Sequence, residues 1–194
     1  MALFPSLPAE SHLADVFRRF PDNAGPLMIY LEGILRSEGA FSIGERELIA
    51  AYCSGLNACT FCYGSHRVYS EVFGLPRGLV DALLEDIETA PVADRLKPVF
   101  RYVKKLNSLP SRLSAADAEA VFAAGWSEEA LYEAIQVCAA FNMMNRIVEG
   151  TGVSFDYDRH DDVRRELRNR REHSYLDFGR RLGVLPPEDE SLNV

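Results

Sequence analysis

The stretch ERELIAAYCSGLNACTFCYGSH, residues 45–66, holds two cysteines three positions apart and a histidine four positions after the second cysteine. Ser42 and Glu45 have the spacing of a capping box, so a helix is expected to begin after Ser42 and to end near Leu56. The residues LNA interrupt the helical pattern, and Asn57 is expected to be the N-cap of a second helix. The stretch therefore predicts two consecutive helices that fold into an antiparallel hairpin.

The two cysteines and the histidine are expected to share one face of the second helix. Each residue of an α-helix advances by about 100°, which places Cys59, Cys62 and His66 within an arc of about 60°. The first turn of a helix offers unpaired N–H groups and the positive end of the dipole, and these lower the pKa of a cysteine. His66 lies one turn beyond Cys62 and is placed to exchange a proton with it.

The fold-back of the hairpin adds a carboxylate. Glu47 lies ten residues before Asn57 and His66 lies nine residues after it, and residues equidistant from the turn of an antiparallel hairpin lie side by side. A carboxylate beside an imidazole orients the ring and raises its basicity. Glu45 is an alternative partner, although its capping box already accounts for it. The predicted catalytic residues are Cys59, Cys62, His66 and Glu47.

A zinc site is the alternative interpretation of the same residues. Cys59, Cys62 and His66 are acceptable zinc ligands, with Cys53 or Glu47 as a fourth. Cys53, however, lies about 120° away from the helix face that carries Glu47. The spacing also matches no common zinc finger. We therefore expect a redox pair without a bound metal, and keep a zinc-stabilised helical interaction module as the alternative.

The remaining sequence predicts an all-α protein. The chain has no strong run of alternating β-branched residues and no glycine-rich phosphate loop after a strand, so neither a nucleotide-binding fold nor a thioredoxin βαβ unit is supported. Cys53 and Cys138 lie in the apolar segments AAYCSGL and IQVCAAF and are expected to pack as small hydrophobic residues. The expected helices cover residues 11–20, 25–38, 42–56, 57–73, 77–87, 95–107, 114–125, 127–150 and 161–183.

Composition limits the class of protein and its partners. The 194 residues fit a single domain, 1–194, and the apolar fraction of 47% with 26% charged residues is typical of globular proteins. The net charge of −8 argues against nucleic-acid binding. Residues 159–181 hold eight arginines and five acids, which we interpret as a solvated helix, with a subunit contact as the alternative. No apolar run is long enough to span a membrane, and the N-terminus lacks a signal pattern, so we expect a cytoplasmic protein.

At residues 45–66 the chain resembles the alkylhydroperoxidase D-like (AhpD-like) branch of the carboxymuconolactone decarboxylase superfamily. The resemblance rests on a glutamate, a CxxC pair that begins twelve residues later, and a histidine four residues after the second cysteine. It extends to the preceding helices and to FNMMNRIVEGTGV, so it covers residues 25–153 and is greatest for the uncharacterized peroxidase-related subgroup. Residues 154–194 would then form a C-terminal helical extension with a loose tail.

This resemblance implies an all-α helical bundle that forms a homo-oligomer (dimer, trimer or hexamer) and reduces alkyl hydroperoxides without a bound cofactor. It implies that Cys62 is the peroxidatic thiol, that Cys59 is the resolving thiol, and that His66 and Glu47 relay a proton. The implied reductant is a dithiol, which is a lipoylated protein for the best-known members. Phe61 stands where those members carry a second histidine, and this difference weighs against lipoyl-dependent turnover. A decarboxylase-like lyase is the remaining alternative, although the decarboxylases lack the CxxC pair.

Overall fold

The computed structural model describes residues 3–169 and 174–188. These residues form ten α-helices and two short 3-10 helices and contain no strand, so the predicted all-α class is confirmed. The helices are α1 (Leu13–Arg19), α2 (Ala24–Arg36), α3 (Ile43–Leu56), α4 (Thr60–Val72), α5 (Leu79–Glu85), η1 (Asp94–Leu96), α6 (Lys97–Asn107), α7 (Ala115–Ala123), α8 (Glu128–Thr151), η2 (Tyr157–Arg159), α9 (Asp161–Asn169) and α10 (Tyr175–Leu182).

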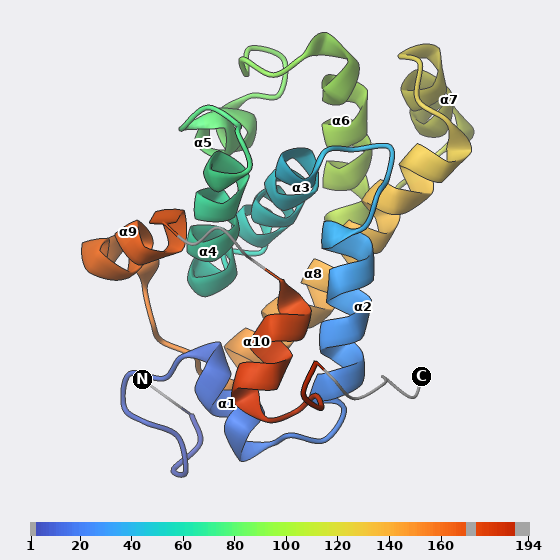
Figure 1. Cartoon of the computed structure of the whole chain (residues 1–194). Coiled ribbons are helices and arrows are strands. Elements are labelled where there is room, and N and C mark those ends of the chain that lie inside the picture. The colour runs from blue at the N-terminus through green and yellow to red at the C-terminus, as the bar shows by residue number, and fades with distance from the viewer. Residues whose placement is uncertain (1–2, 170–173, 189–194) are drawn as a thin grey trace.

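Helix α3 is the centre of the fold. It begins at the predicted capping box, in which the Ser42 hydroxyl accepts a hydrogen bond from the Glu45 N–H at 3.2 Å and the Ser42 N–H donates to the Glu45 carboxylate at 2.8 Å. Helices α4, α5, α6 and α8 pack around it (Figure 1), and ten of its fourteen residues are buried. Because its surroundings are almost entirely protein, polar side chains that α3 carries must find partners inside the fold.

The turn between α3 and α4 differs from the prediction. Asn57 is the C-cap of α3 rather than the N-cap of α4, and Ala58 adopts the left-handed conformation with φ of 55°. The Cys59 N–H donates to the carbonyl of Ser54 at 2.9 Å, which closes α3 with the hydrogen-bond pattern of a Schellman motif. Cys59 is extended and is the N-cap of α4, so the helix begins only at Thr60.

The C-terminal part of the chain also differs from the single helix predicted over residues 161–183. The structure has two helices there, because Ser174 has an extended backbone and caps α10 by accepting hydrogen bonds from Leu176 and Asp177. Glu32 on α2 accepts a further hydrogen bond from the Tyr175 N–H at 2.6 Å. The start of α10 is thus stabilised by α2, which is distant in the sequence. Hydrophobic periodicity cannot predict a contact of this kind. The rest of the predicted helix, residues 170–173, lies outside the described residues.

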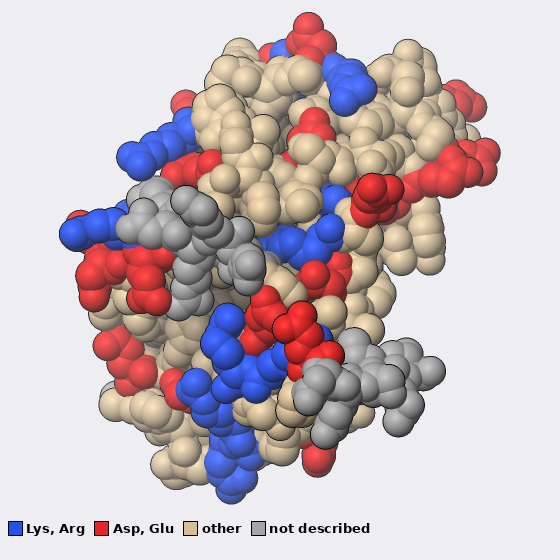
Figure 2. Space-filling model, viewed as in Figure 1, with Lys and Arg blue, Asp and Glu red and all other residues tan. Residues whose placement is uncertain are grey.

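The two terminal segments lie on the same side of the molecule. Helix α10 packs against α2 and contacts α1 (Figure 1). The chain after α10 is packed as far as Leu185, whose side chain contacts the main core; residues 189–194 of the predicted loose tail lie outside the described residues. Figure 2 shows that basic side chains gather over α1 and α10, and those that these two helices carry are all arginines. Over the described residues no helix combines the length and apolar character that a membrane span requires.

Candidate functional site

The two thiols of the CxxC pair occupy different positions relative to α4. Cys59 is the N-cap and Cys62 lies in the first turn, and the exposed fractions of the two residues are 0% and 2%. Both thiols belong to a small apolar cluster with Val68 and Val148. Cys62 also lines a cavity, and Cys59 is not among the residues that line it. The predicted common helix face therefore holds for Cys62 and His66 but not for Cys59, because Cys59 precedes the helix. Both thiols are free.

His66 and Glu47 are brought together across the α3–α4 hairpin. Nδ1 of His66 lies 2.5 Å from Oε2 of Glu47, so the contact predicted from the fold-back is present. The alternative partner, Glu45, is occupied by its capping box with Ser42. Glu47 has no exposed surface, and its carboxylate is therefore held by protein groups alone.

Arg36 is the second partner of that carboxylate, and the sequence reasoning missed it. Nη1 of Arg36 lies 2.5 Å from Oε1 of Glu47. The guanidinium also lies over the rings of Phe73 and Tyr175, 4.8 Å and 5.0 Å from their centroids. No local pattern connects the end of α2 with the middle of α3, so only the general expectation that a buried carboxylate has a cation partner could have indicated this residue.

The electrostatics of Glu47 follow from these two contacts. Burial alone would raise the pKa of the carboxyl, but the charges and hydrogen bonds of Arg36 and His66 outweigh burial and lower it. Glu47 is therefore ionised at neutral pH and accepts the Nδ1–H of His66. Nε2 of His66 is left as the basic nitrogen of the imidazole. The ring is held in place by an edge-on contact with Phe141, whose centroid is 4.4 Å away.

The Cys62 thiol contradicts the expectation of a lowered pKa. The pKa of Cys62 is raised well above 9.0, and a hydrogen bond with the Cys59 thiol is the largest cause and burial the second. A hydrogen bond with Asn145 lowers the pKa, but only in part offsets this rise. These effects exceed that of the helix N-terminus, because a buried thiol loses the hydration of its charged form. Cys62 in the reduced, empty site is thus a protonated thiol that needs a base to become a nucleophile.

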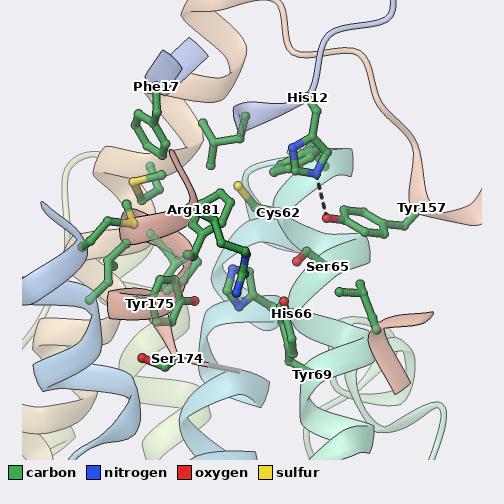
Figure 3. Close-up of a pocket in the computed structure, with 18 of the residues that line it drawn as sticks. His12, Phe17, Cys62, Ser65, His66, Tyr69, Tyr157, Ser174, Tyr175 and Arg181 are labelled. Carbon is green, nitrogen blue, oxygen red and sulfur yellow. Dashed lines mark hydrogen bonds between the residues drawn. The ribbon is translucent and has the colours of Figure 1, made fainter. Parts of the chain in front are cut away.

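Cys62 and His66 open into one cavity of about 290 Å³. Figure 3 shows both side chains at its wall, together with Ser65 and Tyr69 from the same helix. Most of the other side chains that line it are aromatic or aliphatic. These include Phe17, Met28, Leu31, Phe61, Phe141 and Met144.

Two solved structures are similar to this arrangement of helices. An alkylhydroperoxidase AhpD core, described as an uncharacterized peroxidase-related protein from Ralstonia eutropha JMP134, superposes with a TM-score of 0.68 at 21% identity, covering 75% of this chain and 76% of that one. An uncharacterized peroxidase-related protein from Silicibacter sp. TM1040 gives 0.66 at 21% identity, covering 72% and 73%. The chain has the AhpD fold. No protein-family model matches the sequence, and no curated protein matches it either.

Segments outside residues 25–153, the predicted AhpD core, close the cavity over Cys62. His12 and Phe17 come from the N-terminal segment, Tyr157 from η2 and Tyr175 from α10. The other side chains of this roof come from α1, α9, α10 and the N-cap of α10. The terminal helices of this AhpD-fold chain are therefore part of the candidate site and not an appendage to it.

Phe61 packs into this roof. Its ring lies 4.9 Å from the ring of His12 and 5.4 Å from that of Tyr157. The Ala14 N–H donates to Nδ1 of His12, so the proton of the imidazole is on Nε2, which contacts the Tyr157 hydroxyl at 3.1 Å (Figure 3). Burial lowers the pKa of His12, which keeps this imidazole neutral. The sequence pattern did not indicate His12 or Tyr157, because both lie far from the CxxC pair along the chain.

The other two cysteines lie in the main core of the AhpD fold. Cys53 and Cys138 are buried there, as the apolar segments predicted, and a hydrogen bond between the two thiols is the largest cause of the raised pKa of Cys53. Over residues 3–169 and 174–188, no three histidine, cysteine, aspartate or glutamate side chains converge in a way that could hold a metal ion.

Proposed function

We propose that this protein is a thiol peroxidase that reduces organic hydroperoxides through Cys62 and Cys59. The observation that carries the proposal is the shared cavity, in which the Cys62 thiol faces the same space as an imidazole that Glu47 orients. The position of Cys59 also supports the proposal, because Cys59 is hydrogen bonded to Cys62 and does not itself line the cavity. The AhpD fold of the two peroxidase-related structures is consistent with the same activity.

The first step oxidises Cys62. Nε2 of His66 takes the thiol proton, and the resulting thiolate attacks the terminal oxygen of the hydroperoxide. The O–O bond breaks, a sulfenic acid forms on Cys62, and the leaving alkoxide takes the proton back from His66 to give an alcohol. Glu47 stabilises the imidazolium that exists between the two proton transfers, because Arg36 keeps the Glu47 carboxylate ionised.

The second step closes a disulfide. The Cys59 thiol attacks the sulfur of the sulfenic acid, a Cys59–Cys62 disulfide forms, and water leaves. The adjacency of the two thiols favours this step over further oxidation of Cys62 by a second peroxide. An external dithiol then reduces the disulfide by exchange; a lipoylated protein is the reductant that the resemblance implies, and the active form is proposed to be a homo-oligomer in the cytoplasm.

The proposal is tested by counting free thiols before and after addition of cumene hydroperoxide, with the metal content measured on the same sample. We expect the wild type to lose two thiols and to form one equivalent of alcohol. A Cys62→Ser variant should show no rapid loss of thiols. Stoichiometric zinc with no loss of thiols would instead identify a zinc-stabilised module. Turnover of a lactone substrate that persists in a Cys59→Ser, Cys62→Ser double variant would identify a lyase.

A further inference from the structure

Arg181 is a cation at the cavity for which the described residues supply no acidic partner. It lies on α10, is exposed, and still lines the cavity that holds Cys62 (Figure 3). Within the described part of the chain its guanidinium has no ion pair, and Cζ lies 6.0 Å from the centroid of the Phe178 ring. Its neighbour Arg180 is different, because it is bonded to Asp177 at 3.0 Å and does not line the cavity.

A second arginine reinforces the charge at the same place. Arg18, on α1, also lines the cavity and contacts Asp15 only at 3.5 Å. This contact joins two partly exposed side chains, so it neutralises little of the charge. The arginine-rich surface over α1 and α10 in Figure 2 therefore includes two guanidinium groups at the cavity itself.

The interior beyond these arginines is apolar. Phe17, Leu31, Phe61 and Phe141 are buried and line the same cavity as the exposed arginines and the buried thiol. The third arginine that lines the cavity, Arg36, has a buried side chain and is already paired with Glu47. An apolar interior, with an exposed guanidinium that has no ion pair among the described residues, fits an amphipathic molecule that has a hydrocarbon body and a single anionic group.

We propose that the substrate is a carboxylic acid hydroperoxide, whose hydrocarbon body fills the cavity and whose carboxylate binds Arg181. Planar guanidinium and carboxylate groups pair through two parallel hydrogen bonds, which would orient the substrate so that its hydroperoxide reaches Cys62. The volume of about 290 Å³ lies just below the range of about 300–1,000 Å³ that is usual for small-molecule sites. It suits a single chain, so a free fatty acid hydroperoxide is a better fit than a phospholipid hydroperoxide. This substrate class rests on the proposed peroxidase function.

The test compares linoleic acid hydroperoxide with its methyl ester, both below the concentration at which they form micelles, and uses full-length protein. We expect the wild type to have a higher kcat/KM for the acid than for the ester. Arg181→Gln should lower kcat/KM for the acid about tenfold and leave kcat/KM for the ester and for cumene hydroperoxide unchanged. Arg180→Gln is the matched control and should leave all three substrates unchanged. Equal rates for acid and ester in the wild type would overturn the proposal, as would an equal loss on all substrates in Arg181→Gln or faster turnover of a phospholipid hydroperoxide.

A binding measurement separates this proposal from the peroxidase function itself. The alcohol products, linoleic hydroxy acid and its methyl ester, need no turnover to bind. We expect the acid to bind more tightly than the ester to the wild type, and this difference to disappear in Arg181→Gln. Equal affinities would refute the carboxylate site even in an active peroxidase. A retained difference without any peroxide-dependent loss of thiols would support the site and refute only the proposed reaction.

Discussion

Oε2 of Glu47 lies 2.5 Å from Nδ1 of His66, at a carboxylate that has no exposed surface. The contact joins the two helices of the central hairpin and decides which nitrogen of the imidazole is free. Because Arg36 holds the other carboxylate oxygen at the same distance, the three side chains form a connected hydrogen-bonded chain, of which Arg36 and His66 line the cavity. The mechanism proposed for Cys62 depends on this chain, and so do the first two predictions.

Glu47→Gln is expected to slow the oxidation of Cys62 by about 10- to 100-fold, because the amide no longer orients His66 or stabilises its protonated form. The rate is measured by stopped-flow fluorescence of Trp126 or by quenched thiol counting at neutral pH. Glu45→Gln is the control on the same helix, since glutamine also serves in a capping box. Equal rates in wild type and Glu47→Gln would remove the carboxylate from the mechanism.

The stability of the protein is expected to fall at acidic pH through the same carboxyl group. The pKa of Glu47 is lowered from its ordinary value of 4.5 by Arg36 and His66 against the effect of burial. A carboxyl with a lowered pKa in the folded state stabilises the protein fully above about pH 4.5, and this contribution is lost as the pH falls through the folded value. Urea unfolding from pH 7 to 3 should therefore show a greater loss for wild type than for Glu47→Gln. Parallel curves would contradict this assignment.

Cys59→Ala is expected to lower the pKa of Cys62, because the hydrogen bond with the Cys59 thiol is the largest cause of its elevation. The rate of alkylation by iodoacetamide against pH should have its midpoint above 9 in the wild type and at lower pH in the variant. The same variant should accumulate a sulfenic acid that dimedone traps. Cys53→Ala is the control, because it changes a core thiol outside the cavity, and it should leave the midpoint unchanged. An unchanged midpoint in Cys59→Ala would show that burial, and not the hydrogen bond, is the main cause of the raised Cys62 pKa.

Ala58→Gly is expected to stabilise the protein by up to about 1 kcal/mol. Ala58 has φ of 55°, a conformation that costs an L-residue about 1–2 kcal/mol, and glycine recovers most of this cost while adding entropy to the unfolded chain. Urea unfolding gives the difference. Ala120→Gly in α7 is the control and should destabilise by about 1 kcal/mol. A loss of stability in both variants would show that Ala58 makes contacts that offset its strain.

Gly25→Ala is expected to loosen α10 and open the cavity. A Cβ at Gly25 would lie 2.5 Å from the carbonyl oxygen of Val184, so the segment after α10 must shift, at a cost of about 1–3 kcal/mol. Bulky maleimides should then label Cys62 faster. Gly33→Ala on the same helix is the matched control, because a Cβ there meets nothing within 4 Å, and it should be neutral or stabilising. Identical labelling in both variants would show that α10 does not limit access to the thiol.

Much of this architecture could be predicted from the sequence because it depends on contacts close along the chain. Helix periodicity, the Ser42 capping box and the short interruption at Asn57 are local, and together they predict an all-α chain with a central hairpin. Counting residues from the turn then places Glu47 beside His66. The same reasoning placed the N-cap of α4 two residues too early, at Asn57 instead of Cys59. The left-handed Ala58 and the hydrogen bond from Cys59 to Ser54 cannot be recognised from residue composition.

Only the tertiary structure decided the chemical environment of these residues. Arg36 neutralises Glu47 across two helices, and Glu32 fixes the start of α10, which the periodicity had merged with α9. The direction of the Cys62 pKa also depends on burial and on the position of Cys59, and these outweigh the helix N-terminus. Periodicity and capping record interactions within about one helical turn, whereas desolvation and charge pairing depend on which distant surfaces meet. The sequence by itself therefore determined the helices and the candidate residues, and the packing of the chain termini decided the cavity in which those residues face a substrate.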